Sequence, residues 1–291
     1  MKHIIATVAI ALIMIVCYAQ NKENNSKNVE KMESKIELTN KEKAAALITS
    51  LETGDQSTIA YINPTNYKQH NLSVADGLEG FGAVLQHAPQ GGFKANVVRT
   101  FQDGDYAITH TEYDFFGPKI GFDIFKFENG QIIEHWDNFS DLAPNNPSNH
   151  SQTDGATKIT DLDKTEENKA LIKDFVNTVL IGGAYDKLPN YFDGDNYIQH
   201  NSMIGDGLSG FGKAIEEMAK QGITMVFDKS HVLLGEGNFV LSVTEGTFAG
   251  KPTSFYDLFR IEKGKIAEHW DTIETILPES ERKNSNGKFN F

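Results

Sequence analysis

Residues 123–137 read DIFKFENGQIIEHWD, and residues 257–271 read DLFRIEKGKIAEHWD. In each stretch apolar and polar residues alternate, stop at a glycine, and then alternate again. This pattern is typical of a β-hairpin, in which a tight turn joins two antiparallel strands. Because both stretches end in Glu-His-Trp-Asp, we expect the chain to form this hairpin twice and to bring the same side chains together each time.

The turn decides which side chains of the hairpin share a face. A two-residue type I′ turn needs a positive φ at both central residues, which suits Asn-Gly better than the Lys263-Gly264 of the second stretch. We therefore predict a three-residue loop with Gly264 in the left-handed conformation, and the equivalent loop at residues 128–130. In this register Phe127 pairs with Gln131.

Four positions further from this loop, Asp123 lies opposite His135. Opposed side chains share a face, as do side chains two residues apart on one strand. The side chains expected on one face are Asp123, His135 and Asp137 in the first hairpin, and Asp257, His269 and Asp271 in the second. A slip of one residue would instead move Asp123 to the face of Trp136.

Two further motifs show that the duplication extends beyond the hairpin. YKQHN at 67–71 matches YIQHN at 197–201, and DGLEGFG at 76–82 matches DGLSGFG at 206–212, both at an offset of 130 residues. The hairpins are 134 residues apart. A nearly constant offset of this length indicates a duplicated domain and is far too long for a solenoid repeat.

Each copy begins with helical patterns and ends with strand patterns. Helices are expected at 45–51, 56–62 and 77–87 in the first copy, and at 171–180, 184–192 and 207–220 in the second. Asp76 and Asp206 are natural N-caps of the third helices. Strands are expected at 97–101, 106–115, 122–127 and 132–138, and at 225–234, 239–248, 254–261 and 266–272. Helices followed by meandering antiparallel strands predict an α+β domain.

The other segments are predicted to be a leader and connections. Residues 1–19 have a positive start, an apolar run and a small-x-small site at Cys17 to Ala19, which predicts a signal peptide and an exported protein, periplasmic or secreted. The alternative is a membrane-anchored lipoprotein with a lipid on Cys17, the one cysteine of the chain. The remaining ranges are a disordered tether at 20–37, domains at 38–142 and 164–279, a linker at 143–163 and a polar tail at 280–291.

The composition excludes some classes of partner. The chain is 39% apolar and 23% charged, which is ordinary for a globular protein. Its net charge of −13 argues against binding to nucleic acid or to an anionic membrane surface, because both favour lysine and arginine. No phosphate-binding loop, dinucleotide fingerprint or nucleophile elbow is present, so we expect no cofactor.

Taken together, the motifs resemble the SnoaL-like branch of the nuclear transport factor 2-like superfamily. The resemblance implies two tandem cone-shaped α+β domains, in which three helices close a pocket wrapped by a curved antiparallel sheet. Members include polyketide cyclases that perform aldol condensations, relatives such as ketosteroid isomerase and limonene epoxide hydrolase, and many proteins that only bind ligands. In the cyclases an Asp near the end of the last strands is the acid/base. By motif position this implies Asp137 and Asp271, with Asp123 and Asp257 as the neighbouring polar residues.

Each candidate site also has a structural interpretation. His135 and His269 could be oriented by the carboxylates for catalysis, or the Asp-His-Asp groups could only join two strands. Tyr67, His70, Tyr197 and His200 could line the pocket mouths, or the histidines could bond to local backbone. His110, which aligns with Val243, could face the first pocket or be exposed on an edge strand. Trp136 and Trp270 should lie in the core or in an interface. A metal site from His70, Asp123 and His135 has no supporting spacing, so no metal is expected.

These inferences predict a protein with two small-molecule pockets. It would carry out acid/base chemistry of the aldol or isomerisation type on a small apolar carbonyl compound, or it would be a ligand-binding or protein-interaction module. His110 as a hydrogen-bond donor would place activity mainly in the first domain. Domains of the resembling family commonly pair through their sheets, so we expect residues 40–142 and 164–278 to form a pseudo-dimer within one chain, and the protein to be a monomer.

Overall fold

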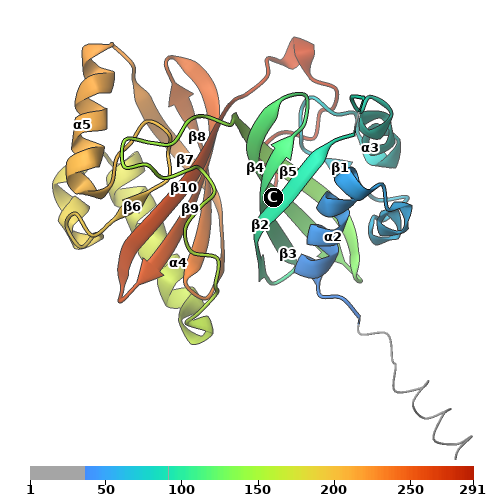
Figure 1. Ribbon diagram of the computed structural model, residues 1–291, viewed down its shortest axis with the longest axis horizontal. Coiled ribbons are helices and arrows are strands. Elements are labelled where there is room, and N and C mark those ends of the chain that lie inside the picture. The colour runs from blue at the N-terminus through green and yellow to red at the C-terminus, as the bar shows by residue number, and fades with distance from the viewer. Residues whose placement is uncertain (1–36, 91) are drawn as a thin grey trace, which may run out of the picture. The chain divides into compact units, whose positions relative to one another are not determined.

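The computed structural model of the protein describes residues 37–90 and 92–291, so the predicted signal peptide and nearly all of the tether lie outside the described residues. Within the described part of the chain, strands form two five-stranded mixed sheets with a few helices (Figure 1). Their strand orders are β1-β5-β4-β3-β2 and β6-β10-β9-β8-β7, so the two repeats have the same topology. Among these residues no helix is both long and apolar enough to span a membrane.

The elements follow the predicted order. The first repeat consists of α2 (Asn40–Thr53), the 3-10 helix η1 (Gln56–Tyr61), β1 (Lys68–Gln69), α3 (Gly77–Gln86), β2 (Lys94–Asp103), β3 (Tyr106–Asp114), β4 (Pro118–Glu128) and β5 (Gln131–Asp141). After η2 (Leu162–Lys164), the second consists of α4 (Thr165–Phe175), the π-helix η3 (Val176–Ile181), the 3-10 helix η4 (Tyr185–Asn190), β6 (Ile198–Gln199), α5 (Gly207–Lys220), β7 (Met225–Glu236), β8 (Phe239–Phe248), β9 (Lys251–Glu262) and β10 (Lys265–Thr275), followed by η5 (Glu279–Glu281). The sheets are mixed rather than purely antiparallel, because the short strands β1 and β6 pair in parallel with β5 and β10.

The turns of the two hairpins differ from the prediction. Glu128 pairs with Gln131, and Glu262 pairs with Lys265, so each turn has two central residues instead of three. Lys263 has a φ of 51° and Gly264 a φ of 72°, as a type I′ turn requires. The left-handed conformation of Lys263 is unfavourable for a residue with a Cβ. The two long strands on either side hold it there.

A β-bulge after each turn restores the predicted faces. Lys126 pairs with Glu134 but Phe127 pairs with Ile132, which leaves Ile133 as the extra residue of a bulge. A corresponding irregularity lies between Ile266 and Glu268. The turn alone would shift the register by one residue from the prediction, and the bulge shifts it by one more. A shift of two keeps every side chain on its predicted face.

One face of each sheet packs against the other repeat. The fully buried Trp136 and Trp270 lie in one core cluster with Phe122, Ile124 and Tyr256, among others. Asn138, on β5, donates from Nδ2 to Thr272 O on β10 at 2.9 Å. These contacts confirm the predicted position of both tryptophans and the predicted sheet-to-sheet contact between the repeats. The monomeric state stays a prediction.

The other face of each sheet is covered by the helices of its own repeat. Leu47 and Ile48 of α2 pack with Phe125 and Phe127 of β4. In the second repeat Ile172 of α4 belongs to the equivalent cluster, which includes Phe259 and Ile261 of β9. The candidate pockets lie between these helices and the sheets.

The linker and the tail both pack against the two repeats. The linker contacts the second repeat and also accepts hydrogen bonds from Arg99 of the first. The tail contacts the first repeat and also places Phe289 against His231 of the second. Asn146 donates to Gln199 O at 2.6 Å, and Trp270 Nε1 donates to Asp154 O at 2.9 Å. In the tail, drawn in red in Figure 1, Lys283 N donates to Leu72 O at 2.8 Å. Phe291 stacks on Trp136 with ring centroids 4.7 Å apart. Residues 280–291 are therefore part of the packed structure. Their asparagines donate hydrogen bonds to the first repeat, and their aromatic rings pack against the core between the sheets.

Candidate ligand pockets

The acidic and histidine side chains of each hairpin meet on the helix-covered face. In the first repeat His135 Nε2 lies 3.0 Å from Asp123 Oδ1, and both side chains are buried. In the second repeat the corresponding distance, from His269 Nε2 to Asp257 Oδ1, is 3.1 Å. The predicted contact of each histidine with its carboxylate is thus confirmed, although Asp123 and Asp257 are directly paired with Asp137 and Asp271 rather than with the histidines.

Asparagines from the repeated Tyr-x-Gln-His-Asn motif complete each group. Asn71 donates from Nδ2 to Asp137 Oδ2, and Asn201 donates in the same way to Asp271 Oδ2, each at 2.7 Å. These asparagines, and the glutamines two positions before them, line the pockets. These amides were not among the pocket residues predicted from the motif. Their recurrence at an offset of 130 residues, close to the 134 of the hairpins, was the available signal.

The two pockets differ greatly in size. The cavity at the Asp-His-Asp group of the first repeat has a volume of about 70 Å³, whereas that of the second has about 420 Å³. A more open cavity of about 700 Å³ lies beside the first and is lined by Asn71, Val84 and Phe139, among others, but not by the Asp-His-Asp group. The cavities of about 70 and 420 Å³ are both lined by the Asp-His-Asp group and by a tyrosine, Tyr67 or Tyr197. The polar residues are therefore shared, and the residues that fill the space are not.

Tyr113 accounts for much of this difference. Its hydroxyl donates to Asp123 Oδ2 at 2.6 Å, and its side chain is buried in the first pocket. Aligning Thr111-Glu112 with Thr244-Glu245 places Gly246 at the equivalent position. A Cβ on Gly246 would come within 1.9 Å of Val226 O, so the close approach of β7 excludes any side chain there. The second pocket therefore lacks the ring that fills the first.

The missing tyrosine leaves a carboxylate oxygen without a partner. Asp123 Oδ2 accepts hydrogen bonds from Tyr113 and from Thr109 Oγ1, the latter at 3.3 Å. The equivalent atom, Asp257 Oδ2, is buried and has no hydrogen-bond partner within the described residues. A buried acceptor left unsatisfied costs about 1–3 kcal/mol, so a donor from a ligand would be bound favourably at this atom.

The hydrogen bonds of the second pocket define where its protons are. Gln199 Oε1 accepts from the backbone N–H groups of His200 and Asn201, both at 2.9 Å, which fixes the orientation of its amide. His269 Nδ1 lies 2.9 Å from the same oxygen and must therefore donate to it. His269 Nε2 lies 3.1 Å from Asp257 Oδ1, so this contact is where a further proton would be held.

Burial and charge shift the pKa values in both groups. Burial lowers the pKa of His269, but the hydrogen bond to Asp257 and the charges of Asp271 and Asp257 outweigh it, so the pKa is raised above its ordinary value. The pKa of Asp271 is raised chiefly by burial and also by the charge of Asp257. In the first repeat burial raises the pKa of Asp137 to about 6, although the positive charges of Lys288 and His135 oppose this.

His70 and His200 do not line the pockets, contrary to one of the two interpretations of the sequence. They stack on Trp136 and Trp270, with ring centroids 4.3 and 4.7 Å apart, on the face between the sheets. Their Nδ1 atoms lie near backbone oxygens, but these belong to the distant Gly287 and Ser151 rather than to local backbone. Side chains alternate along the strand. The glutamine before each histidine and the asparagine after it point into the pocket, so the histidine points to the opposite face. A metal trio of His70, Asp123 and His135 is consequently not assembled.

His110 is neither in the first pocket nor exposed, so both interpretations of it are wrong. It is fully buried between the sheets, where its ring stacks on Phe122 at 4.3 Å and Arg99 Nη1 lies 3.1 Å from its Nδ1. Burial and the charge of Arg99 hold the pKa of His110 well below its ordinary value. Thr109, one residue earlier, is the residue of β3 that faces Asp123, and the alternation sends His110 to the opposite face.

Asp76 and Asp206 occupy the N-cap positions of α3 and α5 but do not cap them through their side chains. Their Oδ1 atoms accept from the backbone N–H groups of Gln69 and Gln199, at 2.9 and 3.0 Å. The two carboxylates therefore tie the helix starts to β1 and β6, the strands that carry the pocket amides.

Comparison with known proteins returned no matching family model and no matching curated protein. The solved structures similar to this chain include SnoaL-like, nuclear transport factor 2-like and ketosteroid isomerase-like proteins at low identity. IdmH from Streptomyces antibioticus, a candidate polyketide cyclase, is 18% identical over 35% of this chain and 93% of its own, with a TM-score of 0.31.

Two others have similar values. A SnoaL-like polyketide cyclase from Agrobacterium tumefaciens is 14% identical over 37% of this chain and 91% of its own, with a TM-score of 0.30. A nuclear transport factor 2-like protein of unknown function from Cytophaga hutchinsonii is 16% identical over 36% of this chain and 94% of its own, with a TM-score of 0.32. At these values no activity or ligand is transferred to this chain.

Proposed function

We propose that the second repeat binds a small, mainly apolar molecule in its pocket and exchanges a proton with it. The observation that carries the proposal is the unpartnered, buried Asp257 Oδ2 at the wall of a cavity of about 420 Å³. Ligand pockets commonly have volumes of about 300–1,000 Å³ and combine apolar walls with a few placed polar groups. The second pocket fits this description. The cavity at the Asp-His-Asp group of the first repeat, at about 70 Å³, falls far below this range.

The arrangement of protons supports acid/base chemistry on a carbonyl compound. Asp271 is a buried carboxyl with a raised pKa, which suits a general base. A proton held between His269 Nε2 and Asp257 Oδ1 would be the donor for the carbonyl oxygen of the ligand, and Asp257 Oδ2 would accept from a hydroxyl group elsewhere on the ligand. Removing a proton from the carbon next to a carbonyl needs such a base, together with a donor near the oxygen where negative charge develops. The reaction class would be an isomerisation or an aldol-type condensation.

The first repeat then serves mainly as the partner that buries the sheet of the second. The earlier expectation that activity lies in the first domain depended on His110 as a donor in the pocket. His110 lies between the sheets instead, and Tyr113 occupies the acceptor of Asp123. We therefore infer that the second repeat is the functional one.

Matched substitutions in the two repeats test this proposal. The protein would be purified and analysed by native mass spectrometry for small molecules that copurify with it. Asp257→Asn should reduce ligand occupancy at least tenfold, because it changes the acceptor that the ligand meets. Asp123→Asn, at the equivalent position of the closed pocket, should leave occupancy unchanged. Equal losses from both, at equal thermal stability, would refute the assignment to the second repeat.

A steric variant separates the pocket from the chemistry. Ala214 of α5 lines the second pocket, and its equivalent in the first repeat is Val84. Ala214→Trp should abolish ligand uptake and Val84→Trp should not. Solvent deuterium exchange into a bound carbonyl ligand then distinguishes the two candidate functions. Exchange that is lost in Asp271→Asn supports catalysis, whereas binding without exchange indicates a ligand-binding module.

A further inference from the structure

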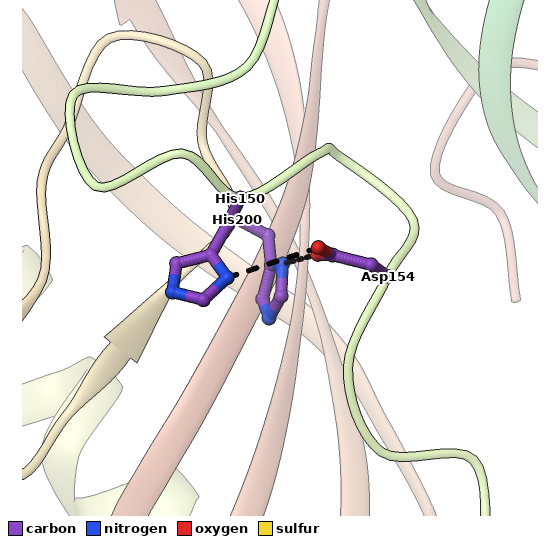
Figure 2. A group of neighbouring side chains, drawn as sticks. All are labelled: His150, Asp154 and His200. Atoms are coloured by element: carbon purple, nitrogen blue, oxygen red, sulfur yellow. Dashed lines mark ion pairs between the residues drawn. The ribbon is translucent and has the colours of Figure 1, made fainter.

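A cluster of side chains outside both pockets joins the linker to the second repeat. It consists of His150 and Asp154 in the linker and His200 just after β6 (Figure 2). His200 Nδ1 lies 2.7 Å from Asp154 Oδ1, and His150 Nδ1 lies 3.7 Å from Asp154 Oδ2. The imidazole nitrogens and the carboxylate thus converge, with all ligand atoms within 4.8 Å of one another.

The opposite nitrogen of each ring is held by a further carboxylate. His150 Nε2 donates to Asp206 Oδ2 at 3.1 Å, and His200 Nε2 donates to Glu268 Oε1 at 2.9 Å. Glu268 is 1% exposed and also accepts from Arg260 Nε at 2.6 Å. Histidines that bind a metal usually donate their second N–H to a carboxylate in this way, which fixes the tautomer and the direction of the ring. Here both rings are fixed with Nδ1 toward Asp154.

This leaves an arrangement that favours a cation. With Nε2 protonated, a neutral imidazole presents a lone pair at Nδ1, and two such lone pairs next to a carboxylate repel it. His200 Nδ1 also lies 2.9 Å from Ser151 O, so several electron-rich atoms meet at this point. A divalent ion would be held there by the nitrogens and the carboxylate oxygen together.

The distances are close to those that a metal requires. Zinc binds imidazole nitrogen and carboxylate oxygen at about 2.0–2.2 Å in tetrahedral geometry, which separates neighbouring ligand atoms by about 3.3 Å. The observed contacts to Asp154, 2.7 and 3.7 Å, lie on either side of this value. The side chain of Asp154 is 47% exposed and that of His150 is 31% exposed, so both can adjust and an ion can enter from solvent.

We propose that His150, Asp154 and His200 form a binding site for a divalent transition-metal ion of the zinc class, with its remaining coordination position open to solvent. The site would fasten the linker to the second repeat. Pro147 and Ser148, a few residues before Asp154, line the second pocket, so the ion would also hold one wall of that pocket in place.

The first repeat shows that His200 alone does not need a metal. His70, its equivalent, places Nε2 3.0 Å from Glu134 Oε2 and Nδ1 2.7 Å from Gly287 O. It therefore has the same structural contacts, but the tail provides no second histidine and no carboxylate at that point. His150 and Asp154 are additions that the shared packing of the two repeats does not explain.

The test uses the purified full chain, freed of metal with a chelator and titrated with Zn²⁺ alone by calorimetry. One ion should bind per chain, and Co²⁺ in its place should give the absorption of a four-coordinate site. His150→Ala and Asp154→Ala, both at partly exposed positions, should each weaken binding at least tenfold while leaving the melting temperature of the metal-free protein nearly unchanged.

Two controls exclude other sites. Asp257→Asn disrupts the Asp-His-Asp group of the second pocket and should leave Zn²⁺ affinity unchanged, as should Asp123→Asn in the first. Affinity that is unchanged in His150→Ala, or that is lost in Asp257→Asn instead, would overturn the proposal. So would the absence of Zn²⁺ binding by the unsubstituted chain.

Discussion

Tyr113 donates its hydroxyl hydrogen to Asp123 Oδ2 at 2.6 Å, and this contact both closes the first pocket and satisfies the carboxylate that the second repeat leaves unpartnered at Asp257. The two repeats therefore have the same acidic group, but only in the second repeat is an oxygen of that group free to bind a ligand. A duplicated domain in this form can keep one copy open to a ligand while the other copy contributes packing.

Removing the Tyr113 ring should open the first pocket. Tyr113→Ala frees Asp123 Oδ2 and leaves a cavity, so the free energy of unfolding should fall by about 3–5 kcal/mol. The first repeat should then bind the ligand of the second, raising the stoichiometry from one ligand per chain to two. Native mass spectrometry measures this number, and denaturant unfolding measures the loss of stability.

Tyr113→Phe is the control for the ring itself. It keeps the pocket filled but removes the shorter of the two hydrogen bonds to Asp123 Oδ2 and leaves only that of Thr109, so we expect a loss of about 1–3 kcal/mol in unfolding free energy and no second ligand. A second ligand in the Phe variant would mean that the ring does not close the pocket.

The raised pKa of Asp137 predicts a specific pH dependence of stability. Its folded value of about 6 lies above the ordinary value of 3.8, so the folded state holds the proton more tightly than the unfolded chain does. The contribution of this group is favourable below about pH 4 and is lost as the pH rises through 6. Asp137→Asn, which stays neutral, should remove this loss and raise the melting temperature at pH 7 relative to the unsubstituted chain.

Melting temperatures between pH 3 and 8 measure this effect. Asp141→Asn, at an exposed position on the same strand, is the control and should not change the slope between pH 4 and 6. If Asp137→Asn has the same slope as the unsubstituted chain, the carboxyl binds its proton no more tightly in the folded protein than in the unfolded chain.

The left-handed Lys263 predicts a stabilising substitution. Its φ of 51° is unfavourable for lysine and well tolerated by asparagine, which stands at the equivalent position, Asn129, of the first hairpin. Lys263→Asn should raise the unfolding free energy by roughly 1 kcal/mol, the order of the left-handed penalty. Lys263→Ala should bring no such gain, because alanine keeps the Cβ, and a gain from alanine would point to the charge of the lysine instead.

Sequence alternation was sufficient to predict the acidic groups. Asp123, His135 and Asp137 lie on one face because the side chains of a strand alternate, a local property that survives an error of two residues in register. The predicted loop was wrong by one residue, and the bulge at Ile133 compensated for it. The bulge could not be foreseen, because it depends on how the hairpin bends against the rest of the sheet.

The directions of the other histidines needed the tertiary structure. The sequence did not determine on which face of their strands the side chains of His70, His110 and His200 lie. They are placed by contacts with segments far away in the chain, such as Trp136, Phe122 and the linker. The cluster of His150, Asp154 and His200 was missed for the same reason. His150 and Asp154 are four residues apart in the linker, but His200 is 50 residues from His150.

The sequence by itself thus determined that the chain contains a duplicated α+β domain, and which polar side chains of each hairpin share a face. Repetition and alternation are properties of neighbouring residues and can be read from their order. Only the tertiary structure decided which pocket is open and what the linker and tail cover. Pocket volume depends on close approaches between distant segments, such as Val226 to Gly246, where a single side chain either fits or is excluded.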